Sequence, residues 1–401
     1  MAETDLAIIG CGASAVALLA QLARMERAEG MHVHIYERSG LYGRGVAYST
    51  PHLGHLLNVR AANMSLYPDA PDDFARWAAE RGYQPADFVP RKIYGDYLCE
   101  RLEEAKGKLS ISFIDGEVMT ARKEGEGIEI ATEKRKMLYP FVVQATGNAK
   151  PIQPKTDGDI ASYHAEPYGI DYSTLKECAH IGLIGSGLSA VDAILALFGA
   201  GYKGKISVFS RHGLFPAAHG TYGESAPYGG LPVEGYEELS PYGVLRLLRM
   251  HVEKAQAQAI PWQSVIDALR PHINILWAKW TRRTREKFMK RLFTIWNVHR
   301  HRMAPDIAAV LHGLVSVGRI EIVKGNVEHI AAGPKIVSES GIYSVDAVIS
   351  CMGYRGREEG RSFDVSAKIG PPLFGEKFET TAMPEIRVQA AAIIDKLLEK
   401  Y

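Results

Sequence analysis

The chain has 401 residues, which is enough for two domains with ordinary hydrophobic cores. Hydrophobic residues make up 46% and charged residues 23% of the sequence, a composition typical of globular rather than disordered proteins. The formal net charge is +1, so no global charge attracts nucleic acid and none is expected as a partner.

Residue types and spacings also argue against several kinds of site. The four cysteines include no C-x-x-C pair, so neither a dithiol reductase nor a zinc ribbon is expected. The histidines are scattered, and we expect no metal site. The segment Met1–Asp5 has no basic n-region, and no apolar stretch reaches the roughly 18 residues of a membrane span. We therefore expect no signal peptide, no membrane association and a cytoplasmic location.

The first glycine-rich turn follows the apolar run Leu6–Ile9, which is typical of a buried parallel strand. The turn reads Gly-Cys-Gly-Ala-Ser-Ala over 10–15 and opens a segment with apolar residues at helical spacing. A second strand is expected over 32–36, with Glu37 at its end. This succession of strand, glycine turn, helix, strand and acid is the context of a dinucleotide-binding fingerprint.

Each small residue of this turn has a physical role. Gly10 permits a tight bend, Gly12 lets a pyrophosphate approach the backbone, and Ala15 allows the helix to pack closely on the strand. A carboxylate at Glu37 accepts hydrogen bonds from ribose hydroxyls and repels a 2′-phosphate, which favours FAD or NAD over NADP. The predicted cofactor contacts of this unit are Gly10, Gly12, Ala13, Ser14, Ala15, Glu37 and Arg38.

A second unit repeats the pattern with one difference. A strand over 180–184 leads into Gly-Ser-Gly-Leu-Ser-Ala over 185–190, then a helix over 191–198 and a strand over 205–209. Arg211 stands where the first unit has an acid, and a guanidinium pairs with a 2′-phosphate, which favours NADPH over NADH. The alternative is that Arg211 is a solvated strand-end residue. The predicted contacts are Gly185, Gly187, Ser189, Ala190 and Arg211.

Further strands lie between and after these units. Short strands are predicted over 111–113, 117–121, 128–131, 141–143 and 347–349. The fourth runs into Thr146 and Gly147 and the last runs towards Gly353, so these residues are also expected beside the cofactors.

The sequence therefore predicts an α/β protein with two Rossmann-like dinucleotide-binding domains. The FAD domain comprises 1–150 and 335–401 and is interrupted by the NAD(P) domain, 151–334. Residues from about 239 to 314 are rich in Leu, Trp, Arg and Lys at helical spacing and predict a helical insertion in the second domain. A closing helix is expected over 383–401.

Five stretches resemble a known family of two-dinucleotide flavoproteins, which includes FAD-dependent urate hydroxylase and the L-aspartate N-hydroxylase of diazo biosynthesis. They are 43–48, 55–65, 90–98, 296–302 and 379–387. The resemblance implies FAD on the first turn and NAD(P)H on the second. It places Arg44 and Asn58 near the flavin, with Gly370 in the closing segment. The stretch 354–368 is shorter than the family pattern, so the resemblance does not fix the shape of the flavin's far side or of the substrate pocket.

The family resemblance and the two turns predict an NAD(P)H-consuming, FAD-dependent monooxygenase that uses O₂ to hydroxylate a small polar substrate. N-hydroxylation of an amine and hydroxylation of a purine ring both remain open. The alternatives are a flavin reductase or oxidase that oxygenates nothing, and a non-catalytic nucleotide-binding protein. The candidate catalytic residues are Asn58, His299 and Arg300. A homodimer is permitted but not required.

Several of these residues have a plainer interpretation. The basic segment His299–Arg302 either attracts an anionic substrate, which partial burial beside Trp296 favours, or is a solvated helix face or pairs with Glu286 and Asp306. The arginines at 282, 283 and 285 are interpreted as a solvated helix face. A helix is expected to start after Pro90 and to use its tyrosines for packing. Asn58 is otherwise a turn residue.

Overall fold

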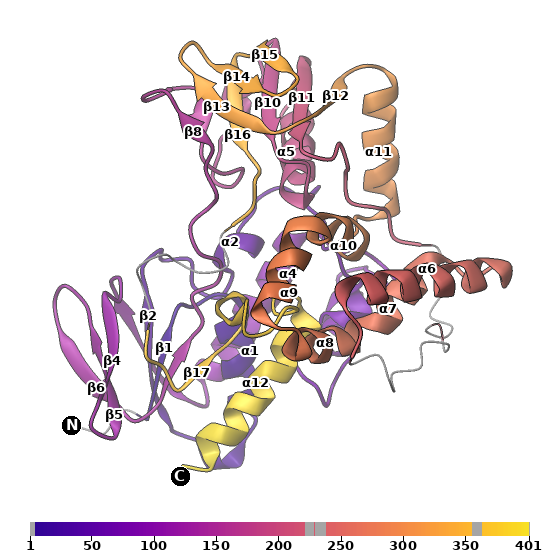
Figure 1. Ribbon diagram of the computed structural model, residues 1–401. Helices are drawn as coiled ribbons and strands as arrows, with labels where there is room; N and C mark the ends of the chain where they lie inside the picture. The colour runs from indigo at the N-terminus through magenta and orange to yellow at the C-terminus, as the bar shows by residue number, and fades with distance from the viewer. Residues whose placement is uncertain (1–4, 221–227, 229–237, 355–362, 401) are drawn as a thin grey trace. The chain divides into compact units, whose positions relative to one another are not determined.

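The computed structural model describes residues 5–220, 228, 238–354 and 363–400 (Figure 1), and the chain forms two compact units. The first comprises 1–150, 354–375 and 379–401, and the second comprises 151–353 and 376–378. The chain returns to the first unit at residue 354, whereas the sequence placed the domain boundary at 335. The reason is that the strands between those positions complete the sheets of the second unit.

The first unit is built on a sheet whose neighbouring strands all pair in parallel, in the order β17-β7-β1-β2-β3. Its central strand β1 is buried on both faces and consists of apolar residues, as a covered parallel sheet requires. A second, antiparallel sheet has the order β4-β5-β6. The strands are β1 Leu6–Ile9, β2 His32–Glu37, β3 Ser110–Asp115, β4 Thr120–Glu124, β5 Gly127–Ala131, β6 Lys136–Tyr139, β7 Val142–Gln144 and β17 Ala367–Lys368.

Helices of the first unit pack around α1, which is buried along nearly its whole length and contacts both α4 and α12. The helix α4 begins directly after Pro90, as predicted, and Tyr94 and Tyr97 are fully buried against Phe74. The packing interpretation of these tyrosines is confirmed. The helices are α1 Ala13–Leu22, α2 Gly45–Tyr48, α3 Asp73–Ala79, α4 Arg91–Lys106 and α12 Met383–Leu398.

The second unit repeats the parallel arrangement, with strand order β12-β11-β10-β16-β9. A second sheet, β15-β14-β13-β8, packs its buried Ile336 against Gly182 of β10, where a side chain would leave no room. The strands are β8 Lys155–Thr156, β9 Tyr163–His164, β10 His180–Ile184, β11 Lys205–Ser210, β12 Ile320–Lys324, β13 Val327–Ala331, β14 Lys335–Ser338, β15 Gly341–Ser344 and β16 Ala347–Ser350.

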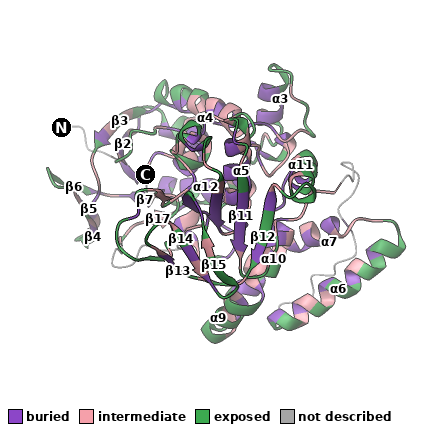
Figure 2. Ribbon diagram, turned by 90° about the horizontal axis from the view of Figure 1, so that it is seen from above, coloured by how far each residue is buried: buried purple, intermediate pink, exposed green. Residues whose placement is uncertain are grey.

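Five helices form the predicted insertion, and Figure 2 shows exposed and buried residues alternating along α6. The Ser240 hydroxyl accepts from the Gly243 N–H and Pro241 follows it, a strong start signal for a helix. The helices are α6 Pro241–Ala257, α7 Trp262–Leu269, α8 Ile273–Lys279, α9 Arg282–Arg291 and α10 Phe293–Arg300.

The insertion ends earlier than the predicted residue 314. Helix α11, Pro305–Ser316, buries Ala308 and Leu311 in the same core as β10 and α5, Leu188–Gly199. It therefore covers the parallel sheet, as the crossover helix between β11 and β12. The strand expected over 117–121 lies at 120–124, and the strands β6, β8, β9, β12–β15 and β17 were not predicted.

Among the described residues, no helix has the length and apolar character needed to cross a membrane. The shortened stretch 354–368, which the sequence singled out, lies for the most part outside the described residues.

Candidate functional site

The first glycine turn is held in shape by the end of the neighbouring strand β7. Gly10 has φ +98°, and a Cβ there would lie only 2.6 Å from the Ala145 carbonyl oxygen. The Ala145 N–H in turn donates to the Ile9 carbonyl over 2.8 Å. Both the left-handed backbone and the close approach require glycine at position 10.

Gly12 caps helix α1 without any side-chain hydrogen bond, and the first turn of α1 contains no acidic residue. The N–H groups at this end therefore keep their capacity to bind an anion, reinforced by the helix dipole. A Cβ on Gly12 would lie 3.6 Å from the Gly45 Cα. Sequence analysis missed Gly45, although its G-x-G spacing with Gly43 was a signal of close backbone packing.

The second turn reproduces this geometry. Gly185 has φ +105°, and a Cβ there would overlap the carbonyl oxygen of Cys351 at the end of β16. The Cys351 N–H donates to the Ile184 carbonyl over 2.7 Å. Gly187 caps α5, again with no side-chain hydrogen bond and no acid in the first turn. Each glycine turn therefore combines a left-handed glycine held by the neighbouring strand with a helix start that has no side-chain cap, and we call the two turns the first and the second cradle.

Strand register shows which residues correspond in the two cradles. Ile9 pairs with Tyr36 in the first sheet, and Ile184 pairs with Phe209 in the second. Glu37 therefore corresponds to Ser210. Arg211, which the sequence analysis set in place of the carboxylate, corresponds instead to Arg38. The carboxylate of the first unit is thus replaced by a hydroxyl, with an arginine one position further on.

Glu37 already holds part of its own turn together. Its Oε2 accepts from the Cys11 N–H over 2.8 Å, and its Oε1 accepts from the N–H and the hydroxyl of Ser39, each over 2.7 Å. A carboxylate has about four lone-pair sites, so acceptor capacity is left for ribose hydroxyls. Arg38, which was also predicted to contact the cofactor, forms an ion pair with Glu117 over 2.9 Å at the surface.

In the second cradle, a contact between Ser186 and Ser210 takes the place of the Cys11–Glu37 hydrogen bond of the first. The Ser186 hydroxyl lies 2.8 Å from the Ser210 hydroxyl and donates to the Leu214 carbonyl over 2.6 Å. These contacts fold the segment after β11 back over the glycine turn. Arg211 is exposed, and no carboxylate stands at position 210 to oppose an incoming phosphate.

Three further predicted cofactor residues of the first unit lie either after strand β7 or beside the start of α1. Thr146 and Gly147 follow β7, and the Thr146 hydroxyl accepts from Gln144 Nε2 over 3.3 Å. Gly370 has φ +73°, and a Cβ there would come within 2.5 Å of the Ser14 hydroxyl. The structure therefore brings Gly370 against the first turn of α1.

In the second unit, Ala190 is fully buried in α5 and Ser189 is half-buried beside it. Gly353 has φ +82° and follows β16, where its carbonyl accepts from the Ile152 N–H over 2.9 Å. Gly353 therefore lies beyond the same strand end as Cys351, in the position that Gly147 takes in the first unit.

Arg44 ties two helices of the first unit together. Its guanidinium pairs with Asp96 of α4 over 2.6 Å, and its Nε donates to the Cys99 sulfur over 3.3 Å. Arg44 immediately precedes α2, so the pair positions α2 against α4. Asn58 is half-buried in the same unit, in the segment between α2 and α3.

The other two catalytic candidates lie in the second unit, at the end of α10. His299 Nδ1 donates to the Ile295 carbonyl over 2.7 Å, and its ring meets Trp262 edge-on at 5.2 Å. Arg300 is only 5% exposed, so partial burial rather than a solvated face is confirmed. The Ala217 N–H donates to the Val298 carbonyl, which brings this basic segment beside the chain that follows Arg211.

Charge and burial affect the neighbours of Arg300. Burial and the cations Arg300, Arg270 and Arg302 lower the pKa of His301 to about 3, so its imidazole is neutral at physiological pH. Arg302 is buried, and its Nη2 meets the two Asp267 carboxylate oxygens at 2.6 and 2.8 Å. Arg302 thus joins α10 to α7 and is committed to structure.

Replacing Arg302 by alanine is expected to lower the free energy of unfolding by about 3 kcal/mol, because it removes the buried cation that pairs with the partly buried Asp267 carboxylate. Arg282 is the matched control: it is 94% exposed and pairs with Glu286 on the helix surface over 2.9 Å. Arg282→Ala should cost less than about 0.5 kcal/mol. Urea unfolding followed by circular dichroism measures both, and equal costs would contradict the structural role of Arg302.

The described residues contain neither a cluster of metal ligands nor a cysteine pair. None of the described His, Cys, Asp and Glu side chains forms a group able to hold a metal ion. The four cysteines are free, and burial raises the pKa of the Cys11 thiol to about 12 and that of Cys351 well above its usual range. These two cysteines pack as apolar side chains.

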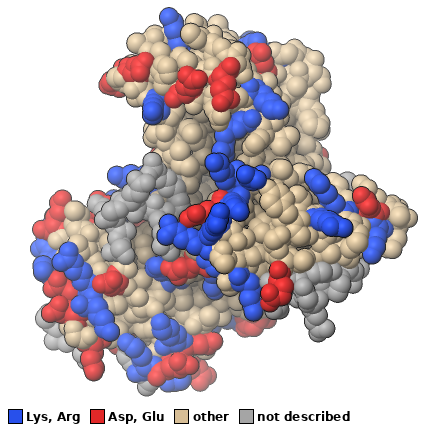
Figure 3. All heavy atoms as spheres, in the orientation of Figure 1, with Lys and Arg blue, Asp and Glu red and all other residues tan. Residues whose placement is uncertain are grey.

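The surface carries charges of both signs. On the face shown in Figure 3, acidic and basic side chains lie interspersed among the described residues.

Residues 7–149 match a protein family described as FAD-NAD(P)-binding. The match covers the first glycine turn, Glu37 and the strand end at Ala145, and it confirms that this part of the chain is a dinucleotide-binding region. Among curated protein sequences, none matches this chain.

Solved structures share the fold over the whole chain. Ornithine N-hydroxylase from Kutzneria sp. 744, solved with reduced FAD, NADP⁺ and L-ornithine, is 13% identical, with a TM-score of 0.65 and 99% of each chain covered. L-Lysine 6-monooxygenase from Pseudomonas syringae is 13% identical, with a TM-score of 0.63 and the same coverage. Bacillithiol disulfide reductase from Staphylococcus aureus is 14% identical, with a TM-score of 0.59, covering 100% of this chain and 99% of its own.

These likenesses confirm the predicted α/β class with Rossmann-like dinucleotide-binding domains. The fold is shared by two hydroxylases and by a disulfide reductase, whereas the family match over residues 7–149 names FAD and NAD(P) as the cofactors of that region. The matches do not single out the urate or aspartate hydroxylases that the sequence resembles.

Proposed function

We propose that this protein is an FAD-dependent, NADPH-consuming monooxygenase that hydroxylates a small polar substrate. The observation that carries this proposal is the difference between its two cradles. Both have the same glycine geometry, but Glu37 ends the ribose-binding strand of the first and Ser210 with Arg211 ends that of the second. A carboxylate suits FAD, whereas a hydroxyl followed by a guanidinium suits the 2′-phosphate of NADPH.

The residues present fit both cofactors. The glycines leave open the space that a Cβ would fill, and the uncapped starts of α1 and α5 offer N–H groups to a pyrophosphate. FAD, when bound, accepts two electrons from NADPH, and its reduced form reacts with O₂. The chain's own part is to hold the two nucleotides by Gly12, Glu37, Gly187 and Arg211 and to exclude water from the reacting rings.

For the substrate, we infer the side-chain amine of an amino acid. The proteins named for ornithine and lysine share the fold over nearly their full length. Purine hydroxylation, which the sequence resemblance also implies, is the second candidate.

The fold is also that of a disulfide reductase, but the cysteines do not favour that activity. The sequence contains no C-x-x-C pair, and burial raises the pKa of both cysteines that lie at glycine junctions, Cys11 and Cys351. A thiol that stays protonated is a poor nucleophile for a disulfide. A hydroxylase therefore explains the described residues better.

The test has two stages. Without oxygen, NADPH should bleach the flavin absorbance of the purified protein, and a flavin that NADPH cannot bleach would favour a non-catalytic role. With oxygen, ornithine, lysine, aspartate and urate are added in turn while NADPH oxidation and peroxide are followed. A substrate should speed NADPH oxidation and lower the peroxide yield. If none of these, nor a wider metabolite panel, does so, the protein is an oxidase or reductase.

A further inference from the structure

The two parallel sheets also correspond at the strand beside the ribose-binding strand. In the first unit this strand is β3, and its last residue, Asp115, pairs with Glu37 of β2. In the second unit it is β12, and its last residue, Lys324, pairs with Ser210 of β11. Lys324 therefore occupies in the second cradle the place that Asp115 occupies in the first.

The residue that follows each strand supports this alignment. Gly116 and Gly325 both have positive φ, +131° and +144°. The Gly116 N–H donates to the Glu37 carbonyl over 3.3 Å, and the Gly325 N–H donates to the Ser210 carbonyl over 3.1 Å. The same backbone hydrogen bond thus closes the same strand end in both units, and the positions after it also correspond.

The charges at the corresponding positions differ. Three acids stand at this edge of the first sheet: Glu37, Asp115 and Glu117. The residues in their places in the second sheet are Ser210, Lys324 and Asn326. A hydroxyl, an ammonium and an amide have therefore replaced three carboxylates, so that an edge that repels a phosphate has become one that attracts it.

The side chain of Lys324 lies against the turn that carries Arg211. A Cβ built on Gly213 would lie 3.6 Å from the Lys324 Cβ and 3.8 Å from its Cγ. Paired residues of neighbouring strands point to the same face of a sheet, so Lys324 projects on the face where the Ser210 hydroxyl meets Ser186 at 2.8 Å. Lys324 and Arg211 are both exposed beside the glycine turn.

The acid that lies beside this edge is engaged elsewhere. Glu339 follows β14, and its Oε2 accepts from the Asn326 N–H over 2.9 Å while its Oε1 accepts from Asn326 Nδ2 over 2.7 Å. No ion pair links Lys324 or Arg211 to any carboxylate of the described residues. Both cations therefore keep their charge for a ligand.

We propose that Lys324 is a second specificity-determining cation of the second cradle and binds, together with Arg211, the 2′-phosphate of NADPH. A phosphate monoester carries a charge of about −1.5 to −2 near pH 7, so one guanidinium leaves part of it unmatched. The guanidinium supplies directed N–H donors, and the ammonium, on its flexible stem, supplies a point charge from the β12 side. This inference deepens the proposed function and rests on its assignment of NADPH.

Binding of NADP⁺ and NAD⁺ to the purified, FAD-loaded protein tests the proposal without turnover. The two nucleotides differ only in the 2′-phosphate, and calorimetric titration at about 50 mM salt keeps the screening of charges weak. Lys324→Ala is expected to weaken NADP⁺ binding about 5–20-fold and NAD⁺ binding less than about 2-fold. Lys324→Arg should restore most of the loss. Lys324→Asp, which copies the acid of the first cradle, should weaken NADP⁺ binding more than alanine does.

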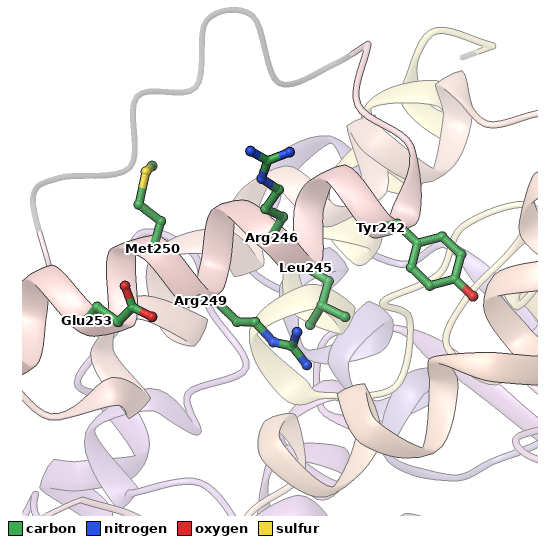
Figure 4. A pocket seen from close by; sticks show the side chains of 6 residues that line it. All are labelled: Tyr242, Leu245, Arg246, Arg249, Met250 and Glu253. Carbon is green, nitrogen blue, oxygen red and sulfur yellow. The ribbon is translucent and has the colours of Figure 1, made fainter.

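Two exposed cations of the second unit provide matched controls. Lys205 begins β11, at the end opposite to Ser210, and pairs with Glu321 over 2.6 Å. Arg246 projects from α6 in the helical insertion, where it lines a shallow groove (Figure 4). Replacing either residue by alanine removes one positive charge from the same unit and should change the NADP⁺ affinity less than about 2-fold. Circular dichroism checks that each variant folds.

The outcomes separate this inference from the proposed function. An unchanged NADP⁺ affinity in Lys324→Ala, beside a selective loss in Arg211→Ala, would overturn the role of Lys324 and leave the NADPH assignment intact. Equal losses of NADP⁺ and NAD⁺ in Lys324→Ala, or the same loss in Arg246→Ala, would also overturn it, because the 2′-phosphate would not be what Lys324 binds. A parent protein that binds NAD⁺ as tightly as NADP⁺ would instead contradict the NADPH assignment itself.

Discussion

Substituting valine for Gly12 is expected to give a folded but colourless protein. The backbone at Gly12, with φ −91°, suits any residue, and a Cβ would make ordinary contact with Gly45 at 3.6 Å. The branched methyl groups, however, would occupy the space in which a pyrophosphate meets the start of α1. Loss of two charge-assisted hydrogen bonds corresponds to a fall in FAD affinity of about 100-fold or more. Flavin absorbance per mole of purified protein measures it.

Gly187→Val provides the control in the second cradle, because a Cβ there meets no atom within 4 Å. This variant should keep its flavin and its colour but lose reduction by NADPH. Gly10 is unsuitable for the comparison, since φ +98° and the Ala145 carbonyl make any side chain there a folding defect. A Gly12→Val protein that retains FAD at the parent's stoichiometry would show that the first cradle does not hold the flavin.

The sequence predicted the parts of the fold that depend on local pattern. Apolar runs such as Leu6–Ile9, followed by glycines at fixed spacing, mark a buried parallel strand and a tight turn in any such sheet. The second unit's β12–β15 escaped notice because each is only four or five residues long and shows no regular alternation of buried apolar and exposed polar residues. Pairing with distant strands decides their structure, and no local signal reports it.

In the candidate site, too, the sequence predicted the features set by neighbouring residues and missed those set by contacts between distant residues. The glycines of both cradles were identified correctly as turn residues, but the correspondence of Ser210 with Glu37 depends on which residues pair across β10 and β11. Likewise, the basic segment suggested that Arg302 binds a substrate. In the structure Arg302 pairs with Asp267, which lies 35 positions away in the sequence. Sequence separation hides such pairs, because only the fold brings their helices together.

Arg211→Ala is expected to weaken NADPH binding about 10–100-fold and NADH binding less than about 2-fold, because only NADPH carries the 2′-phosphate that the guanidinium pairs with. Ser210→Glu, added to Arg211→Ala, should go further and reverse the preference. It places a carboxylate in the register of Glu37, where it accepts from ribose hydroxyls and repels a phosphate. The ratio of kcat/KM for the two nucleotides, measured by flavin reduction, tests both steps.

Arg38→Ala is the matched control for this pair, since Arg38 occupies the register of Arg211 in the first cradle but forms an ion pair with Glu117. It should change neither nucleotide preference nor flavin content. Equal losses of NADPH and NADH binding in Arg211→Ala would mean that Arg211 contacts a group common to both nucleotides. The 2′-phosphate assignment would then be wrong, whereas the glycine geometry at Gly185 and Gly187 would still fit a pyrophosphate.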